Sequence, residues 1–166
     1  DKGQGVSQDY KKAVSLYRLA AEQGVADAQN NLGTMYLEGR GVPQDYKEAV
    51  KWIRLAAEQG NDMGQYNLGA MYQEGRGVPQ DYKEAVKWIR LAAEQKFAPS
   101  QFNMGFMYET GTGVLKDYST AHMWFNLCGS SGDQECVKNR KILEEKMTPS
   151  QIEKAQDMAS DWKPKK

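Results

Sequence analysis

The sequence has little of what metal binding and catalysis require. It contains one histidine and two cysteines in 166 residues, whereas a structural zinc site is usually a tetrahedral set of Cys and His ligands. The Gly-x-Gly loops at Gly39 and Gly75 follow helical patterns, not strands, and no Lys-Ser/Thr pair comes after them, so they are not typical of phosphate-binding loops. We therefore expect no metal, no cofactor and no enzymatic activity.

The sequence also has no excess of positive or negative charge, and it contains no long apolar run. Lys and Arg total 22, and Asp and Glu total 22, so no overall field attracts nucleic acid or anionic lipid. No apolar run approaches the roughly 18 residues that span a bilayer, and the first residues lack the segments of a signal peptide. Nucleic-acid binding and membrane insertion are not expected.

What the sequence does contain is a repeat. The segment EGRGVPQDYKEAVKWIRLAAEQ runs from Glu38 to Gln59 and returns unchanged from Glu74 to Gln95, 36 residues later. A fixed period of this length is typical of stacked supersecondary units, each of which buries its apolar face against its neighbours. The repeat predicts one elongated domain.

Each repeat contains two helical patterns. In the first, apolar residues recur at steps of three and four from Tyr46 to Ala57, with Asp45 as the cap before them and Gly60 beyond the other end. In the second, a glycine returns inside the helix, and because glycine costs about 1 kcal/mol there, this predicts a close crossing of the two helices of the repeat. These glycines are Gly33, Gly69 and Gly105.

The last copy departs from the pattern. Arg140 and Lys141 replace the Leu-Gly pair, and Glu144 replaces the following Tyr. An atypical terminal repeat is what capping an array requires. Thr148, with Pro149 and Gln151 after it, then predicts the start of a final helix. The predicted fold is an all-α solenoid of nine helices.

The first residues are expected to be a loop. Gly3 to Val6 fall in the register of Gly39 to Val42, so the chain is predicted to begin in the remnant of a missing upstream repeat, with an apolar flank open to self-association or a bound neighbour. The predicted bounds are 1–5 for this loop, 6–41, 42–77 and 78–113 for three repeats, 114–147 for a degenerate terminal repeat, and 148–166 for a capping helix and tail.

The single histidine is predicted to be structural. His122 lies in the register of Val14, Val50 and Val86, on a helix face that packs. The spacing places no acid or nucleophile beside it, so a catalytic role is not favoured.

The repeat resembles a known family. The order A-x-x-x-L-G-x-x-Y-x-x-G-x-G-V-x-x-D-Y-x-x-A-x-x-W-x-x-x-A-A-x-x-G begins at Ala28 and is similar to the Sel-one-like repeat (SLR), a relative of the tetratricopeptide repeat (TPR). The resemblance implies a right-handed superhelical solenoid of antiparallel helix pairs. It does not imply an enzymatic reaction. It also implies a bacterial envelope-signalling or host-interaction protein, periplasmic or secreted rather than cytoplasmic.

The two cysteines allow two interpretations. Cys128 and Cys136 lie eight residues apart in the registers of Ala20 and Ala28, where small residues let two helices approach within bonding reach of the sulfur atoms. Resemblance to a secreted, cysteine-rich branch of the family implies a disulfide here. The alternative is a pair of buried thiols that fill alanine-sized spaces.

A ligand groove is implied by the related TPR arrays, whose second helices line a concave surface. The positions beside the packing stripe vary between copies here while the packing positions do not, and they form an apolar, aromatic patch suited to a peptide or protein partner. The alternative is that the curvature of the array buries these side chains. The predicted groove residues of this kind are Met63, Tyr66, Gln73, Phe102, Phe106 and Glu109.

A row of asparagines accompanies this patch, at Asn31, Asn67, Asn103 and Asn139. An Asn amide both donates and accepts hydrogen bonds, so a row at repeat spacing is suited to holding an extended peptide backbone. The alternative is that each side chain satisfies carbonyl groups of the neighbouring repeat.

The predicted function is that of a non-enzymatic adaptor or scaffold that binds a protein or peptide in this groove. Two alternatives remain at this point. One is an inhibitor or helper of a cell-wall enzyme, which needs a wide contact with a folded protein. The other is a structural module that self-associates through the N-terminal flank.

Overall fold

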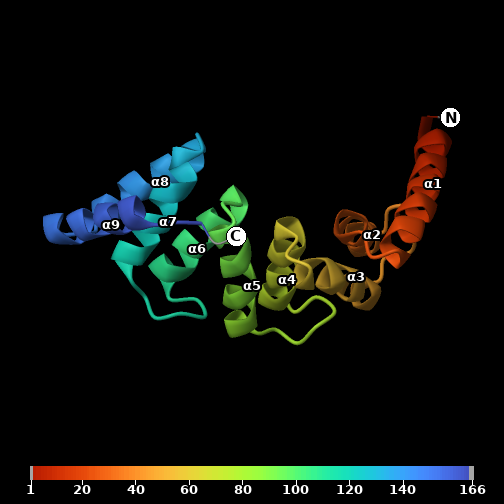
Figure 1. The fold of residues 1–166 in the computed structure, drawn as a ribbon, viewed down its shortest axis with the longest axis horizontal. Helices are drawn as coiled ribbons and strands as arrows, with labels where there is room; N and C mark the ends of the chain where they lie inside the picture. The colour runs from red at the N-terminus through yellow and green to blue at the C-terminus, as the bar shows by residue number, and fades with distance from the viewer. Residues whose placement is uncertain (1, 165–166) are drawn as a thin grey trace. The chain divides into compact units, whose positions relative to one another are not determined.

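The computed structural model describes residues 2–164, with side chains from Asp9 onward. This part of the chain is all helical and contains nine helices (Figure 1). The predicted fold class and number of helices are confirmed. The helices are α1 (Lys2–Glu22), α2 (Ala26–Glu38), α3 (Tyr46–Glu58), α4 (Asp62–Glu74), α5 (Tyr82–Glu94), α6 (Ala98–Thr110), α7 (Tyr118–Ser130), α8 (Gln134–Glu144) and α9 (Pro149–Asp161).

The chain divides into two compact units. Unit 1 covers residues 1–81 with α1 to α4, and unit 2 covers residues 82–166 with α5 to α9. Consecutive helices pack against each other from α1 to α4 in unit 1 and from α5 to α8 in unit 2, and α9 packs on α7. Among the described residues, no helix combines the length and the apolar character needed to cross a bilayer.

The helix ends follow the predicted capping. The Asp45 carboxylate accepts hydrogen bonds from the backbone N–H groups of Lys47 and Glu48 at the start of α3, which satisfies donors that have no partner inside the helix. Gly60 has a φ of 88°, the left-handed conformation predicted beyond the other end. Lys96 occupies the same register with a φ of 72°, although it is not glycine.

The close crossing was predicted between the two helices of one repeat, but it involves the second helix of one repeat and the first helix of the next. A Cβ atom on Gly33 would lie 2.5 Å from Ile53 Cγ1 and 3.0 Å from the backbone oxygen of Ala49. In unit 2, a Cβ atom on Gly105 would lie 2.5 Å from Phe125 Cε1. These two glycines therefore set the distance between α2 and α3 and between α6 and α7.

Each unit has its own core. In unit 1, one cluster joins α1, α2 and α3, with Trp52 of α3 as its largest member; its buried residues are Val14, Ala21, Ala28, Leu32, Met35 and Trp52. In unit 2, a cluster of Ala121, Phe125 and Leu143 joins α7 and α8. The core of a repeat array thus lies between successive helices.

The predicted final helix is confirmed as α9. Thr148 and Gln151 form a capping box, with Pro149 in the first turn. Ala155 is fully buried, and the Trp162 ring lies edge-on to that of Trp124, with 6.3 Å between centroids. Helix α9 therefore covers α7 at the end of unit 2.

The predicted loop at residues 1–5 is wrong for the residues that the structure describes. Helix α1 begins at Lys2 and runs through this segment. In the second copy, the equivalent loop is held by the helix before it, since the Asp45 N–H donates to the Tyr36 carbonyl. In α1 the corresponding residues are helical instead, so their backbone groups pair within the helix.

Candidate functional site

The predicted groove residues lie on the second helix of each repeat, and they fall into two patches. In unit 1, α4 carries Met63, Tyr66, Asn67 and Gln73, and α2 carries Asn31. In unit 2, α6 carries Phe102, Asn103, Phe106 and Glu109. We call these sets the α4 patch and the α6 patch.

The α6 patch is built on three phenylalanine rings. Phe106 lies edge-on to Phe102, with 4.9 Å between centroids, and edge-on to Phe125, with 5.5 Å. Phe125 is fully buried and Phe102 is half-buried, whereas Phe106 stays 37% exposed. Edge-to-face contacts of this kind hold aromatic rings in place. Phe106 is thus a fixed aromatic ring that water still reaches.

One edge of the α6 patch is closed by an ion pair that the sequence analysis missed. Lys146 Nζ, in the segment after α8, lies 2.9 Å from Glu109 Oε1. The hydrogen bond to Glu109 and the charge of that carboxylate raise the pKa of Lys146. Met147 packs against the core cluster together with Phe102. The segment after α8 therefore borders the patch.

The repeat register identifies one residue of α8 that is equivalent to Phe106. Ile142 lies 36 residues after Phe106, at the same position of the repeat, and its side chain is exposed. The sequence analysis did not use this position because the last copy departs from the pattern at Arg140 and Lys141. The 36-residue period is the sequence signal that could have identified Ile142.

The α4 patch combines one exposed apolar side chain with hydrogen-bonded neighbours. Met63 is exposed, and Tyr66 and Gln73 are half-buried. The Asn67 amide donates to Asn30 Oδ1 on α2 at 2.9 Å. This amide group therefore links α2 and α4 in the structure.

The other asparagines of the row have different surroundings. The Asn139 amide donates to the Glu135 carbonyl one turn earlier in α8, at 2.8 Å. Asn31 and Asn103 are half-buried, and neither side chain has a hydrogen-bond partner among residues 9–164. The four amides therefore do not form one uniform row.

His122 is buried in the terminal helix pair. Its Nε2 lies 2.8 Å from Glu144 Oε1, and Arg140 Nε lies 3.5 Å from the same oxygen. Arg140 also donates to Asn126 Oδ1 at 2.6 Å. The sequence analysis placed His122 on a packing face but missed Glu144, which lies on the next helix. A ring this deeply buried is part of the packing of α7 on α8.

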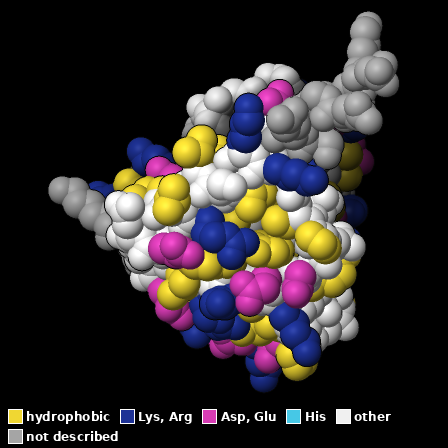
Figure 2. All heavy atoms as spheres, turned by 90° about the vertical axis from the view of Figure 1, so that its right-hand side faces the viewer, with side chains coloured by type: hydrophobic (Ala, Val, Ile, Leu, Met, Phe, Trp, Pro, Cys, Tyr) yellow, Lys and Arg dark blue, Asp and Glu magenta, His cyan; other side chains and the backbone are white. Residues whose placement is uncertain are grey.

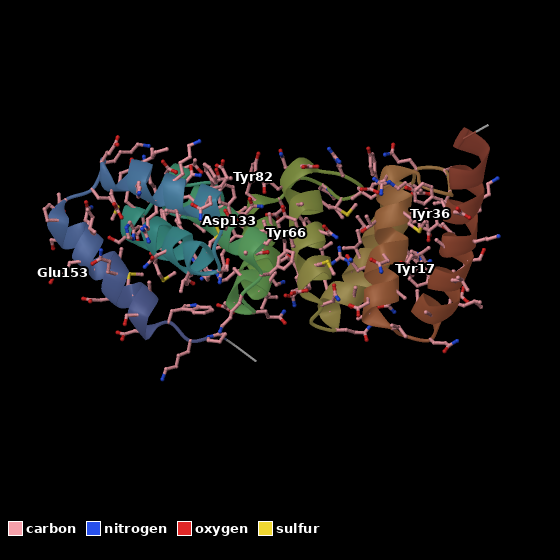
Figure 3. The ribbon with its side chains drawn as sticks, turned by 90° about the horizontal axis from the view of Figure 1, so that it is seen from above. Tyr17, Tyr36, Tyr66, Tyr82, Asp133 and Glu153 are labelled. Carbon is pink, nitrogen blue, oxygen red and sulfur yellow. A yellow bond between two sulfur atoms is a disulfide. The ribbon has the colours of Figure 1, made fainter. Side chains whose placement is uncertain are left out.

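The two cysteines are joined in the structure. A disulfide connects Cys128 in the last turn of α7 to Cys136 in the first turn of α8, with 5.8 Å between Cα atoms. Both residues are fully buried. Asp133, labelled in Figure 3, lies between the two cysteines in the sequence. It caps α8 by accepting hydrogen bonds from the N–H groups of Glu135 and Cys136. The cross-link therefore fixes the turn between the last two helices of the array.

Comparison with protein families gives the same repeat. The family model for the Sel1 repeat matches residues 1–25, 26–61, 62–97 and 98–133. The chain belongs to the Sel1 repeat family. The Sel1 matches span the helices from α1 to α7 and stop before α8, where the last copy departs from the pattern.

Two solved structures show how this Sel1 chain compares with bacterial proteins. It is 37% identical, with a TM-score of 0.84, to c5321, a protective antigen present in uropathogenic Escherichia coli strains that displays an SLR fold. It is 40% identical, with a TM-score of 0.71, to a Sel1 repeat protein from Oxalobacter formigenes. The alignments cover 90% and 76% of this chain but only 32% and 52% of those chains. No curated protein matches the chain significantly.

Sel1 repeats are generally protein-interaction modules, and this chain is an α-solenoid of that kind. The family assigns it no reaction. The question for this chain is which surface contacts a partner.

Proposed function

We propose that this Sel1 chain is a non-enzymatic adaptor that binds a peptide or protein partner, with Phe106 of the α6 patch as the main anchor. The observation that carries the proposal is that this ring is both held in place and partly exposed. Its edge-to-face contacts with Phe102 and Phe125 fix it, yet more than a third of its surface is exposed. Rigid aromatic side chains lose little entropy on binding and are enriched among the residues that dominate interface energies.

The surroundings of Phe106 fit an apolar side chain flanked by polar groups. Phe102 and the exposed Ile142 supply apolar surface in the same unit, and the Glu109–Lys146 pair supplies a polar edge. The Asn103 amide, next to Phe102 in sequence, has no side-chain partner within the described residues, so it is free to bind backbone groups of a peptide. A partner with an aromatic or aliphatic anchor matches this arrangement.

We place this function in an oxidising bacterial compartment, either the periplasm or the exterior. Disulfides persist in such compartments and are rare in the cytoplasm, and the Cys128–Cys136 cross-link supports this location. A role in envelope signalling or host interaction is supported by the similarity to c5321, which is described as a protective antigen of uropathogenic strains.

A peptide-library selection tests the adaptor function. Peptides enriched on the protein are titrated against the parent, Phe106→Ala and Leu115→Ala. Leu115 is a matched control because it is 90% exposed and lies in the loop between α6 and α7, outside the α6 patch. For a hot-spot residue we expect Phe106→Ala to weaken binding about 30-fold and Leu115→Ala to leave it unchanged. Equal affinities for the parent and Phe106→Ala would refute the assignment of the anchor.

A further inference from the structure

A pair of glutamine side chains joins neighbouring repeats in unit 1. Gln29 on α2 is buried, and its Nε2 donates to the Ala21 carbonyl at 3.1 Å. Its Oε1 accepts from Nε2 of Gln59, the residue that follows α3, at 2.6 Å. Both ends of the buried Gln29 amide are therefore hydrogen-bonded, as is usual for a polar group inside a protein.

The equivalent pair is broken in unit 2. Gln101 on α6 lies two repeats after Gln29 and is only 3% exposed. Its Nε2 donates to the Ala93 carbonyl at 3.2 Å, as Gln29 does to Ala21. The register of Gln59, however, holds Ser131, whose hydroxyl donates to the Cys128 carbonyl at the end of α7. No donor within the described part of the chain reaches Gln101 Oε1.

Gln101 and Ser131 line one cavity in unit 2. Its volume is about 270 Å³, several times the roughly 30 Å³ that a water molecule occupies in the liquid. Leu127 and Trp162 supply apolar walls, and the Trp162 ring is held edge-on against that of Trp124. The Oε1 atom of Gln29 faces Gln59, so the same register directs Gln101 Oε1 toward Ser131. The cavity thus joins apolar walls to a buried acceptor.

Lys96 is a second departure from the repeat pattern at this cavity. It lines the cavity from the turn between α5 and α6, at the register of Gly24, Gly60 and Gly132. Its φ of 72° is a conformation that favours glycine, and residues held in such conformations cluster at binding sites. At the α1 end of the chain, side chains of both charges are interspersed (Figure 2). The described lining of the cavity, in contrast, includes the Lys96 ammonium and no carboxylate.

We propose that this cavity binds the side-chain carboxamide of a glutamine residue in a partner peptide. The amide nitrogen of the ligand donates to Gln101 Oε1, its carbonyl oxygen accepts from the Lys96 ammonium, and its methylene groups lie against Leu127 and Trp162. Unit 1 provides the precedent, because the Gln59 amide makes the same bond to Gln29. An ionised glutamate has a similar shape but no hydrogen to donate to Gln101.

A residue within a peptide fits this cavity better than free glutamine does. The amino acid carries an α-ammonium group, and the described lining offers it no carboxylate, only the like charge of Lys96. Capping that nitrogen in a peptide bond removes the charge. The cavity therefore favours a glutamine side chain that enters from a peptide backbone.

The cavity is separate from the α6 patch. Gln101 and Phe106 are five residues apart on α6, which places their side chains about 140° apart around the helix. The described lining of the cavity includes neither Phe102 nor Phe106. Binding of a glutamine side chain here does not depend on the anchor proposed for the adaptor function.

The test is an NMR titration of the ¹⁵N-labelled whole chain with glutamine capped at both ends, as N-acetyl-glutamine N-methylamide. A ligand of this size is expected to bind with a Kd of about 1 mM. We expect saturable shifts of the Gln101 side-chain amide and of the backbone amides of Lys96 and Ser131. The matched control ligand is the equally capped glutamate, which should bind at least about 10-fold more weakly because it lacks the donor.

Two variants use residues that the chain already carries at these registers, so we expect both to fold. Ser131→Gln supplies the missing donor to Gln101 from within the chain and should abolish binding without loss of stability in urea. Lys96→Gly removes the cationic donor and should weaken binding about 3-fold or more, again without loss of stability, because glycine accepts this φ. Leu115→Gln, at a 90% exposed position outside the cavity, is the matched control and should bind like the parent.

Three results would overturn the proposal. The first is the absence of saturable shifts, which leaves water as the occupant. The second is capped glutamate that binds as tightly as capped glutamine, which indicates an anion site at Lys96. The third is unchanged binding by Ser131→Gln. Tighter binding of free L-glutamine than of the capped form would overturn the assignment to a peptide.

A failure at this cavity is distinguishable from a failure of the adaptor function. Phe106→Ala should leave the titration with capped glutamine unchanged, since its ring lies outside the cavity. Ser131→Gln, in turn, should leave unchanged the affinity for library peptides that depend on Phe106.

Discussion

Removal of the Cys128–Cys136 disulfide is expected to destabilise unit 2 by about 2.5 kcal/mol. The bond closes a loop with a sequence separation of eight residues. In the chain-entropy treatment, a loop of that size loses about 8 cal/mol/K of entropy in the unfolded state, which is about 2.5 kcal/mol at 25 °C. The short loop places this value near the lower end of the usual range for disulfides.

The replacement should be Cys128→Ala together with Cys136→Ala, because the first repeat of this chain carries alanine at both positions. Ala20 and Ala28 occupy the same registers, and Ala28 is buried in the core cluster of unit 1. Alanine therefore fits the backbone geometry of this turn. The measured change then reports mainly the cross-link, with a smaller contribution from the lost sulfur atoms.

The assay is urea unfolding at 25 °C, followed by circular dichroism, of the parent and the double variant with and without reductant. Reductant should lower the stability of the parent to that of the double variant and should leave the variant unchanged. A count of free thiols under denaturing, non-reducing conditions accompanies it, and we expect none in freshly isolated protein. Two titratable thiols, or a parent as stable with reductant as without, would show that the cysteines are buried thiols.

Four further changes have expected outcomes in the same unfolding assay. Trp52→Ala should cost about 3 to 5 kcal/mol because the ring lies in the core of unit 1, and a loss below about 1 kcal/mol would exclude that role. Phe106→Ala should cost less than about 1.5 kcal/mol, since its ring is partly exposed; a loss equal to that of Trp52→Ala would make Phe106 a core residue. Gly105→Ala should destabilise by about 1 to 2 kcal/mol, because the contact with Phe125 outweighs the gain in helix propensity; a stabilised variant would contradict the close crossing. Burial raises the pKa of Asp117, but hydrogen bonds from Thr120 and Ser119 outweigh it and hold the pKa below its ordinary value of 3.8. The stabilisation by Asp117 is therefore present above pH 3.8 and is lost as the pH falls through the lower value of the folded state. Asp117→Ala should cost about 1 kcal/mol at pH 7, and the difference from the parent should shrink below about pH 4; a difference independent of pH would refute the cap.

The sequence was sufficient to predict the helices because several separate signals indicate the same helix. The Asp45 cap, the apolar stripe from Tyr46 to Ala57 and the Gly60 end all indicate the same helix. A close contact at Gly33 was also predictable, since a glycine inside a helix needs a packing reason, but the helix that makes the contact belongs to the next repeat. A helix can be predicted from its sequence when such local signals agree.

The candidate site was less predictable, because the repeat pattern does not indicate which side-chain atoms of neighbouring segments come within bonding distance of each other. The register placed Asn67 beside the groove, but it did not indicate that the amide bonds to Asn30, 37 residues earlier. The Glu109–Lys146 pair joins α6 to the segment after α8, where the repeat no longer guides the alignment. The start of α1 was missed because the repeat register specified a loop at residues 1–5, whereas the helix begins at Lys2.

The terminal repeat shows how a few substitutions close one end of the array. In the other copies an Arg on the first helix donates to a Tyr hydroxyl on the second, as from Arg90 to Tyr108 at 2.6 Å. In the last copy these two positions are Asn126 and Glu144, and Arg140 lies between them, bonding to both.

Glu144 also pairs with His122, which replaces a core valine. The apolar surface that would receive a further helix is thus replaced by polar side chains, among which Glu144 pairs with both His122 and Arg140. Desolvating these groups under a new helix would be costly, and α9 covers α7 beside them. At α1 no such substitution occurs: Leu16 and Tyr17 keep apolar side chains at the registers of Trp52 and Ile53.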